Sequence, residues 1–338
     1  MTKNEINDLI SAAQFPQSSV FEELIETHIS WVIVCDRFVY KIKKPIQYSF
    51  LDFSTVDKRK YYCEREVFLN QRLTDDIYID VQPIRKNENA FSIGSGTGEI
   101  TDYAVRMNKV DRSRQMDVLL VKNEVTDIDL RKLAERMAAF HKNTEIIYQK
   151  DYLDVQEKFN DLEAEKSYLK ENLPLSYFII PYAINVSNKF IEANNELLAT
   201  RLKSGFFRDC HGDLHSRNIF LLSTPQPFDC IEFNDDYRQI DVLNEIAFLC
   251  MDLEAFGRPD LSEKFVNYYK NEFETIRNEE ERRLFIYYKC YRSNIRAKVN
   301  SLRARSAQNI AEQKAALAET DKYLNLTHGY LKLLETGH

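Results

Sequence analysis

A short loop near residue 210 constrains the fold more than any other stretch. Residues 210–222 read Cys-His-Gly-Asp-Leu-His-Ser-Arg-Asn-Ile-Phe-Leu-Leu, so Asp213 follows His211 by two positions and Asn218 follows Asp213 by five. An apolar run of strand type begins directly after Asn218. In phosphoryl transfer, one carboxylate orients the attacking hydroxyl and a nearby carboxamide oxygen binds Mg²⁺ against the phosphates. The spacing therefore indicates a phosphate-transfer loop that leads into a strand.

The residues after the loop predict a β-hairpin that carries an acid. Residues 219–222 and 228–233 read as two strands, joined by a turn at residues 224–227. In kinases, the strand after the catalytic loop ends in a carboxylate that is the second metal ligand. The predicted ligand is Glu232. Asp229 is the alternative, but it lies three residues earlier, and a regular strand would turn it to the opposite face.

The pattern His-x-Asp-x-x-x-x-Asn is that of the protein-kinase catalytic loop. With Gly212 after the histidine, and His215 where protein kinases usually carry lysine, the loop resembles that of the aminoglycoside phosphotransferase family. The resemblance covers residues 30–305 and is strongest at residues 211–218 and 232–254. It implies transfer of a phosphoryl group to a hydroxyl.

The resemblance also implies a role for individual residues. Asp213 is implied to be the base that orients the acceptor hydroxyl, and Asn218 and Glu232 are implied to bind Mg²⁺. A helix is predicted over residues 242–256, because Gly257 and Pro259 form a typical helix end. The supporting residues implied in the same way are His211, His215 and Asp241, the last of which precedes that helix.

Three further stretches, residues 40–45, 50–53 and 230–234, resemble a bacterial subgroup of this family. In that subgroup the domain is often fused to a C-terminal P-loop ATPase domain. No P-loop motif is present, so the stand-alone form is expected. The implied fold is α+β, protein-kinase-like and bilobal. An antiparallel-sheet N-lobe with one main helix is expected over residues 1–105, and a mostly helical C-lobe over residues 106–338.

A lysine on a predicted hairpin indicates where phosphates bind. Residues 31–35 and 38–42 are rich in β-branched and aromatic side chains, which favours two paired strands. A kinase uses a lysine on such a strand to hold the α- and β-phosphates. Lys41 best matches the apolar-x-Lys-apolar pattern. Lys43 lies on the same face and is the alternative, and a solvated strand end is the non-functional interpretation of both.

A helix predicted over residues 55–73, with Ser54 as its N-cap, supplies the partner of that lysine. Glu66 lies 25 residues after Lys41, a separation that suits the helix glutamate of a kinase, and Glu64 is the alternative. Lys41 and Glu66 are therefore the predicted nucleotide-binding pair.

A glycine-rich run at residues 94–98 is a weaker signal. A phosphate cradle precedes a helix, whereas strands are predicted on both sides of this run, so it is predicted to be a hairpin tip. The turn that covers the nucleotide is expected near residues 28–37. Because that stretch contains no glycine, the nucleotide-covering loop stays unassigned. Short helices are predicted over residues 4–13 and 18–27, and mostly helical structure beyond residue 130.

A basic run lies near the C-terminal end. Residues 282–305 contain eight basic residues and no acid. Such a run either lines a pocket for an anionic acceptor or pairs with the acidic stretch at residues 229–254. Pairing is favoured, because charge runs usually lie on solvated or mutually paired faces.

The composition limits the partners. The formal net charge of −7 argues against a dedicated binder of nucleic acid or anionic membrane, and no apolar run approaches the ~18 residues that span a bilayer. Residues 1–11 contain no apolar core of a signal peptide. The six cysteines include no Cys-x-x-Cys motif. A cytoplasmic protein with reduced thiols is expected.

These observations predict a kinase that moves the γ-phosphoryl group of ATP, or of GTP, to a hydroxyl of a small molecule with Mg²⁺ as cofactor. The alternative is a degenerate kinase fold that binds nucleotide, or acts through partners, without transfer. Fold resemblance does not identify the acceptor, which stays open.

Overall fold

The computed structural model describes residues 1–12, 15–88 and 90–336. They form two compact units. Unit 1 consists of Met1–Leu119 and Arg217–Tyr237, and unit 2 of Leu120–Ser216 and Arg238–His338. The predicted lobes, residues 1–105 and 106–338, are a different division and stay a prediction.

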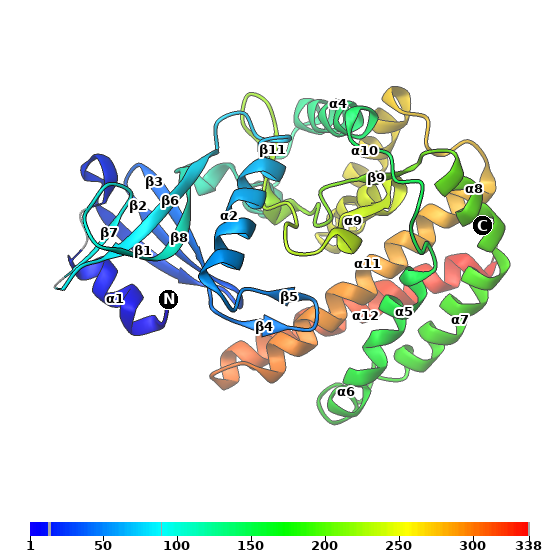
Figure 1. Cartoon of the computed structure of the whole chain (residues 1–338). Coiled ribbons are helices and arrows are strands. Elements are labelled where there is room, and N and C mark those ends of the chain that lie inside the picture. Colours follow the sequence, from blue (N-terminus) through cyan, green and yellow to red (C-terminus); the bar gives the residue numbers. More distant parts are fainter. Residues whose placement is uncertain (13–14, 89, 337–338) are drawn as a thin grey trace. The chain divides into compact units, whose positions relative to one another are not determined.

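Unit 1 is built on a six-stranded antiparallel sheet with the strand order β1-β2-β3-β8-β6-β7 (Figure 1). The predicted hairpin is confirmed, because β2 pairs with β3 and Val32 lies opposite Lys41. The strands are β1 (Phe21–Glu26), β2 (Ser30–Cys35), β3 (Phe38–Lys43), β6 (Tyr78–Lys86), β7 (Phe91–Ile93) and β8 (Glu99–Asn108). Two short pairs complete the unit, β4 (Gln47–Tyr48) with β5 (Leu51–Asp52) and β10 (Ile219–Phe220) with β11 (Gln226–Pro227).

The helix predicted over residues 18–27 is wrong. Residues Phe21–Glu26 form β1, in which Glu26 lies opposite Trp31 and Leu24 packs against the core. Pairing with β2 satisfies the backbone groups of this segment, so tertiary context overrides its local preference. Part of the first predicted helix, at residue 13, lies outside the described residues, and α1 (Lys3–Ala12) accounts for the rest.

The alternation of β3 divides its side chains between two faces of the sheet. Tyr40 and Ile42 join Ile6 and Leu9 of α1 in one apolar core. Val39 belongs to a second cluster on the other face, together with side chains from α2 (Val56–Asn70). Lys41 and Lys43 follow Val39 at period two and therefore share its face.

Two local details of unit 1 differ from prediction. Thr55, not Ser54, caps α2, since its side chain accepts a hydrogen bond from Lys58 N. The glycine-rich run is not a hairpin tip, because it connects β7 to β8, which pair with opposite edges of β6. Gly98 has φ +122°, and a Cβ there would lie 2.4 Å from the Lys86 carbonyl oxygen, so the turn needs glycine.

Unit 2 is mostly helical, as predicted. Its centre is α9, where apolar residues on every side bury nearly the whole helix, and the long helices α11 and α12 run side by side (Figure 1). The helices after α2 are α3 (Met116–Val121), α4 (Asp127–Asn143), α5 (Asp154–Asn160), α6 (Lys166–Asn172), α7 (Ile179–Ala193), α8 (Asn195–Lys203), α9 (Val242–Ala255), α10 (Pro259–Glu272), α11 (Glu279–Arg305) and α12 (Ile310–Thr336).

Short strands and 3₁₀ turns lie between the longer elements of both units. The strands β9 (Phe207–Asp209) and β12 (Gln239–Asp241) pair within unit 2. The 3₁₀ turns are η1 (Pro16–Ser18), η2 (Arg112–Arg114), η3 (Asp161–Glu165), η4 (Ser216–Asn218) and η5 (Asp235–Tyr237). All six cysteines are buried free thiols. Of the helices that the structure describes, none combines the length and apolar character needed to cross a bilayer.

Candidate active site

Two lysines of β3 converge on one glutamate of α2. Lys41 Nζ lies 2.8 Å from Glu66 Oε1, and Lys43 Nζ lies 2.6 Å from Glu66 Oε2. The Glu66 side chain is fully buried, whereas the alternative, Glu64, is exposed and lies 3.8 Å from Lys60. Both candidate lysines therefore bind the predicted glutamate.

The segment after β11 gives each lysine a second carboxylate. Lys41 Nζ lies 2.6 Å from Asp229 Oδ1, and Lys43 forms an ion pair with Glu232. Residues 228–233 do not form the predicted strand, since β11 ends at Pro227 and Asp229 has a left-handed φ of 62°. This turn removes the strict alternation of a strand, so two acids three positions apart both reach the lysines of β3.

Solvent access separates the two lysine–acid pairs. The Lys41 side chain is 13% exposed and that of Asp229 is 44% exposed. The corresponding values for Lys43 and Glu232 are 1% and 4%. The pair of Lys41 and Asp229 is therefore open to a ligand, while the pair of Lys43 and Glu232 is enclosed.

The cluster contains three carboxylates and two ammonium groups, and their interactions shift several pKa values. Burial by itself raises the pKa of Glu66, but Lys41 and Lys43 together lower it to about 2. Burial raises the pKa of Glu232, and repulsion from Glu66 acts in the same direction. Burial alone would lower the pKa of Lys41, but attraction to Asp229 and Glu66 raises it well above its usual range. Both Lys41 and Glu66 are therefore charged across the physiological pH range.

Asn218 lies directly before β10, at the start of the β10–β11 hairpin. Its carbonyl oxygen accepts a hydrogen bond from Phe228 N at 2.9 Å, so the chain just before Asp229 runs alongside it. Within the described residues, no group of three or more His, Cys, Asp or Glu side chains is arranged to hold a metal ion. A metal at Asn218 would therefore need ligands from water or phosphate as well.

The predicted base belongs to unit 2, on a loop framed by β9 and β12. Arg238 donates two hydrogen bonds to Asp209, at 2.7 and 2.9 Å, and both side chains are buried. Cys210 N donates to the Arg238 carbonyl oxygen at 3.0 Å. These bonds fix the entry to the loop that carries Asp213.

Two acids of α9 hold the loop backbone. Glu245 accepts hydrogen bonds from His211 N at 2.8 Å and from Gly212 N at 3.0 Å. Asp252 accepts two hydrogen bonds from Ser216, one from the Ser216 backbone N at 2.8 Å and one from the Ser216 hydroxyl at 2.5 Å. Gly212 has φ 88°, a conformation that favours glycine. Residues on both sides of Asp213 are thus fixed to a buried helix.

The Asp213 side chain itself remains accessible, with 38% of its surface exposed. His215 Nε2 lies 3.3 Å from Asp213 Oδ2, and His211 Nδ1 accepts a hydrogen bond from Asp213 N at 3.2 Å. Burial would raise the pKa of Asp213, but His215, and beyond it Arg296, hold that pKa well below its usual range. Asp213 is therefore an ionised, accessible carboxylate.

Asp241 supports the neighbouring segment. It accepts two hydrogen bonds from Arg201, at 2.6 and 2.8 Å, and caps α9 by accepting from Leu243 N at 2.9 Å. Sequence reasoning missed Glu245 and Asp252, which hold the loop itself. Their signal was present, because two acids seven residues apart lie on one face of a helix that is otherwise almost wholly apolar.

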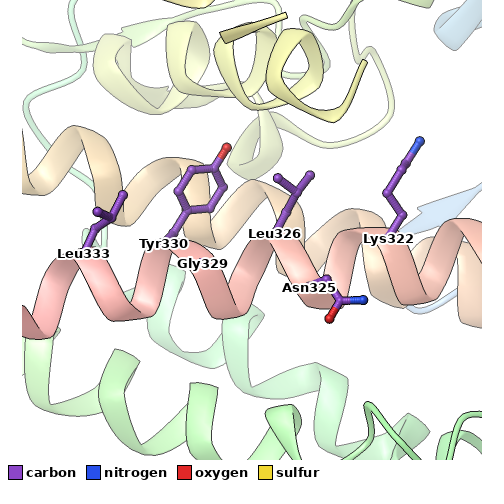
Figure 2. Close-up of a pocket in the computed structure, with 6 residues that line it drawn as sticks. All are labelled: Lys322, Asn325, Leu326, Gly329, Tyr330 and Leu333. Atoms are coloured by element: carbon purple, nitrogen blue, oxygen red, sulfur yellow. The ribbon is translucent and has the colours of Figure 1, made fainter. Parts of the chain in front are cut away.

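An apolar groove of about 650 Å³ lies along α12 in unit 2 (Figure 2). In this view Leu326, Tyr330 and Leu333 point to one side of the helix. None of the predicted site residues lines the groove, and we assign it no part in the chemistry. Its lining residues are Lys322, Asn325, Leu326, Gly329, Tyr330 and Leu333.

Comparison with known sequences gives relatives without an assigned activity. No family model matches the chain. The uncharacterized protein Rv2004c of Mycobacterium tuberculosis (strain ATCC 25618 / H37Rv) is 27% identical over 324 residues, which are 94% of this chain and 62% of the relative. The uncharacterized protein Mb2027c of Mycobacterium bovis gives the same values. The chain therefore spans less than two thirds of the length of these relatives.

Comparison with solved structures identifies the fold. A choline kinase from Cryptosporidium parvum Iowa II superposes with a TM-score of 0.59 at 11% identity, over 96% of this chain and 94% of that one. An ethanolamine kinase from Plasmodium vivax gives a TM-score of 0.53 at 10% identity, over 91% and 82%. A choline/ethanolamine kinase family protein from Mesorhizobium loti gives 0.51 at 10% identity, over 91% and 92%. The predicted α+β, protein-kinase-like fold is confirmed, and these choline and ethanolamine kinases share it.

Proposed function

We propose that the protein transfers the γ-phosphoryl group of ATP, or of GTP, to a hydroxyl group of a small molecule. One observation carries the proposal: Lys41 Nζ lies 2.8 Å from Glu66 and 2.6 Å from Asp229. A strand lysine held between a helix glutamate and the acid that follows the catalytic loop is the arrangement with which kinases bind nucleotide phosphates. The accessible, ionised carboxylate of Asp213 supports the acceptor half of the reaction.

The nucleotide base has an apolar surface beside Lys41. Val39 precedes Lys41 by two residues on the same face of β3. Val39, Val110 and Leu222 are only partly buried in the apolar cluster of unit 1, which also contains Phe220. A planar base needs apolar contacts on both faces, so we assign it to these side chains.

Mg²⁺ is the proposed cofactor, and the oxygen donors of Asn218 and of the segment after β11 fit it. Mg²⁺ keeps several waters and is usually bound by one or two carboxylates together with substrate phosphates. Asn218 is the proposed amide ligand. Glu232 is the carboxylate ligand predicted from the sequence, but it is enclosed in its pair with Lys43. Asp229 is more exposed and lies on a left-handed turn, so we favour Asp229 as the metal ligand. When bound, the ion would neutralise charge on the β- and γ-phosphates.

The protein's own residues would supply positioning and charge. Lys41 would hold the phosphates, with Glu66 fixing the ammonium group. Asp213 would accept a hydrogen bond from the acceptor hydroxyl and so aim its oxygen at the γ-phosphorus. His215, at the position of the kinase loop lysine, would stabilise the transferring phosphoryl. Because the transition state is loose, such positioning accounts for most of the rate enhancement.

A screen of ATP consumption against hydroxyl-bearing metabolites tests the proposal. Alcohols, sugars, nucleosides and amino alcohols would be compared with wild type and with Asp213→Asn, and nucleotide affinity would be measured in parallel by calorimetry. We expect acceptor-dependent consumption by wild type that falls about 100-fold in the variant. Consumption that is the same in both proteins would contradict the assignment of Asp213.

A regulatory nucleotide-binding module is the second candidate. The observation that favours it is the turn between β1 and β2, residues 27–29, which reads Thr-His-Ile and contains no glycine to approach the phosphates. Nucleotide binding with no acceptor-dependent turnover would favour this candidate over the kinase.

A further inference from the structure

The basic run of α11 is largely paired within unit 2. Lys289 lies 2.9 Å from Glu254, Lys298 lies 2.8 Å from Asp161, and Arg305 lies 2.8 Å from Glu165. Of these three partners, only Glu254 belongs to the acidic stretch at residues 229–254. Most of these charges therefore have partners, although largely different ones from those expected.

Arg292 serves the catalytic loop. It donates to Asn244 Oδ1 at 2.6 Å and to the Gly212 carbonyl oxygen at 3.1 Å. Its positive charge also partly offsets Glu245, whose pKa burial raises to about 7. Arg292 is therefore fully engaged as a positioning residue.

Arg296, one helical turn further on, is different. Among the described residues it forms no salt bridge, and its buried Nε has no hydrogen-bond partner. The guanidinium lies 5.5 Å from the centre of the Tyr323 ring. A largely buried arginine donor without an acceptor is costly, which is the situation that an anionic ligand relieves.

The position of Arg296 connects it to the reaction. Burial by itself would lower the pKa of Arg296. Tyr323 raises that pKa, and so do the negative charges of Asp252 and Asp213. Asp252 already accepts both hydrogen bonds from Ser216. Arg292, one turn earlier on α11, donates to the carbonyl oxygen of Gly212, the residue before Asp213, so Arg296 lies on the helix that contacts the catalytic loop, and its Nε has no hydrogen-bond partner.

We propose that Arg296 binds an anionic group on the acceptor, so that the substrate is a hydroxyl compound bearing a carboxylate or a phosphate. This inference rests on the proposed function. The hydroxyl would lie at Asp213 and the anionic oxygens at the guanidinium, which presents several donors to a carboxylate or phosphate. A cationic acceptor would be repelled by the same charge.

Two series of compounds with matched skeletons test the inference. The first is glycerate, glycerol and 3-aminopropane-1,2-diol, and the second is gluconate, glucose and glucosamine. ATP consumption would be measured with wild type, Arg296→Gln and Arg296→Lys. Lys298→Gln is the control, since it removes a charge from the same helix at a surface pair. Thermal unfolding would show that each variant is folded.

We expect wild type and Lys298→Gln to favour the anionic member of a series. Arg296→Gln should lower that preference roughly 10- to 100-fold, because one charge-assisted contact is lost, and Arg296→Lys should retain part of it. A preference for neutral or cationic members, or a preference that Arg296→Gln leaves intact, would overturn the inference.

Two further outcomes distinguish the possible failures. If Arg296→Gln slows transfer to charged and neutral acceptors by the same factor, the arginine binds the transferring phosphoryl and not the acceptor, which also overturns the inference. Consumption no greater than that of Asp213→Asn with every compound would overturn the proposed function, and the inference with it.

Discussion

Lys43 Nζ lies 2.6 Å from Glu66 Oε2, and these two side chains are almost completely excluded from solvent. Lys41, on the same face of β3, binds the other oxygen of Glu66 but remains partly exposed. The two lysines therefore share a partner and differ in access. This difference separates a structural lysine from a ligand-binding one.

Lys43→Met should mainly affect stability. Without Lys43, the buried negative charges of Glu66 and Glu232 lose a neutralising ammonium group. Breaking a buried ion pair in this way costs about 3–5 kcal/mol of folding free energy. The free energy of unfolding, measured with urea, should fall by that order. Lys60→Met, at an exposed position of α2, is the control and should change it little. A stability equal to that of wild type would show that Lys43 is not a structural residue.

Lys41→Met should mainly affect the nucleotide. We expect ATP affinity, measured by calorimetry, to fall at least about tenfold, since a charge-assisted contact to phosphate is lost. Glu66→Gln should act in the same direction, and the double variant should lose less than the sum of both, because the pair acts as a unit. Full additivity would show that Glu66 does not act through Lys41, and an affinity loss confined to Lys43→Met would assign the phosphates to Lys43.

Asp229 and Glu232 can be separated by their effect on metal binding. We expect Asp229→Asn to raise the Mn²⁺ concentration needed for half-maximal binding to the ATP complex by about tenfold or more, measured by the electron paramagnetic resonance of free Mn²⁺. Glu232→Gln should leave this concentration near that of wild type but lower the free energy of unfolding. Asp236→Asn, an exposed carboxylate in the turn η5, is the control. A metal affinity that responds to Glu232 and ignores Asp229 would restore the assignment made from the sequence.

Glu245 should make stability depend on pH. Burial raises its pKa from an ordinary 4.5 to about 7, so the folded state holds a proton that the unfolded chain loses. The stabilisation is fully present below pH 4.5 and is lost as the pH rises through 7, a change of roughly 3 kcal/mol. Relative to Glu245→Gln, which has no proton to lose in this range, wild type should therefore become less stable as the pH rises.

Urea denaturation of both proteins at pH 5 and pH 8 measures that difference directly. Glu280→Gln, at an exposed position, should follow wild type at each pH. A gap between wild type and Glu245→Gln that does not change with pH would mean that Glu245 ionises normally in the folded protein.

Part of the site could be predicted from the sequence, because some of its residues lie close together along the chain. Asp213 and Asn218 are held five positions apart on one loop whatever surrounds them, and the two strands of the β2–β3 hairpin adjoin in sequence. Period-two alternation put Lys41 and Lys43 on one face, whereas the choice of Glu66 over Glu64 as their partner was decided by the packing of α2. The loop spacing, the hairpin and the shared face are short-range relationships, and the sequence alone determined them.

Tertiary structure decided the rest. Lys41 and Asp229 are 188 residues apart in the chain, and no local pattern predicts the left-handed turn that brings Asp229 to Lys41 and leaves Glu232 to Lys43. Likewise Glu245 reaches the backbone of His211 only because α9 is buried beneath the loop. Local propensity does not predict such pairs. Asp229 and Glu232 are chemically equivalent carboxylates, and the packing of the whole core decides which lysine each one contacts.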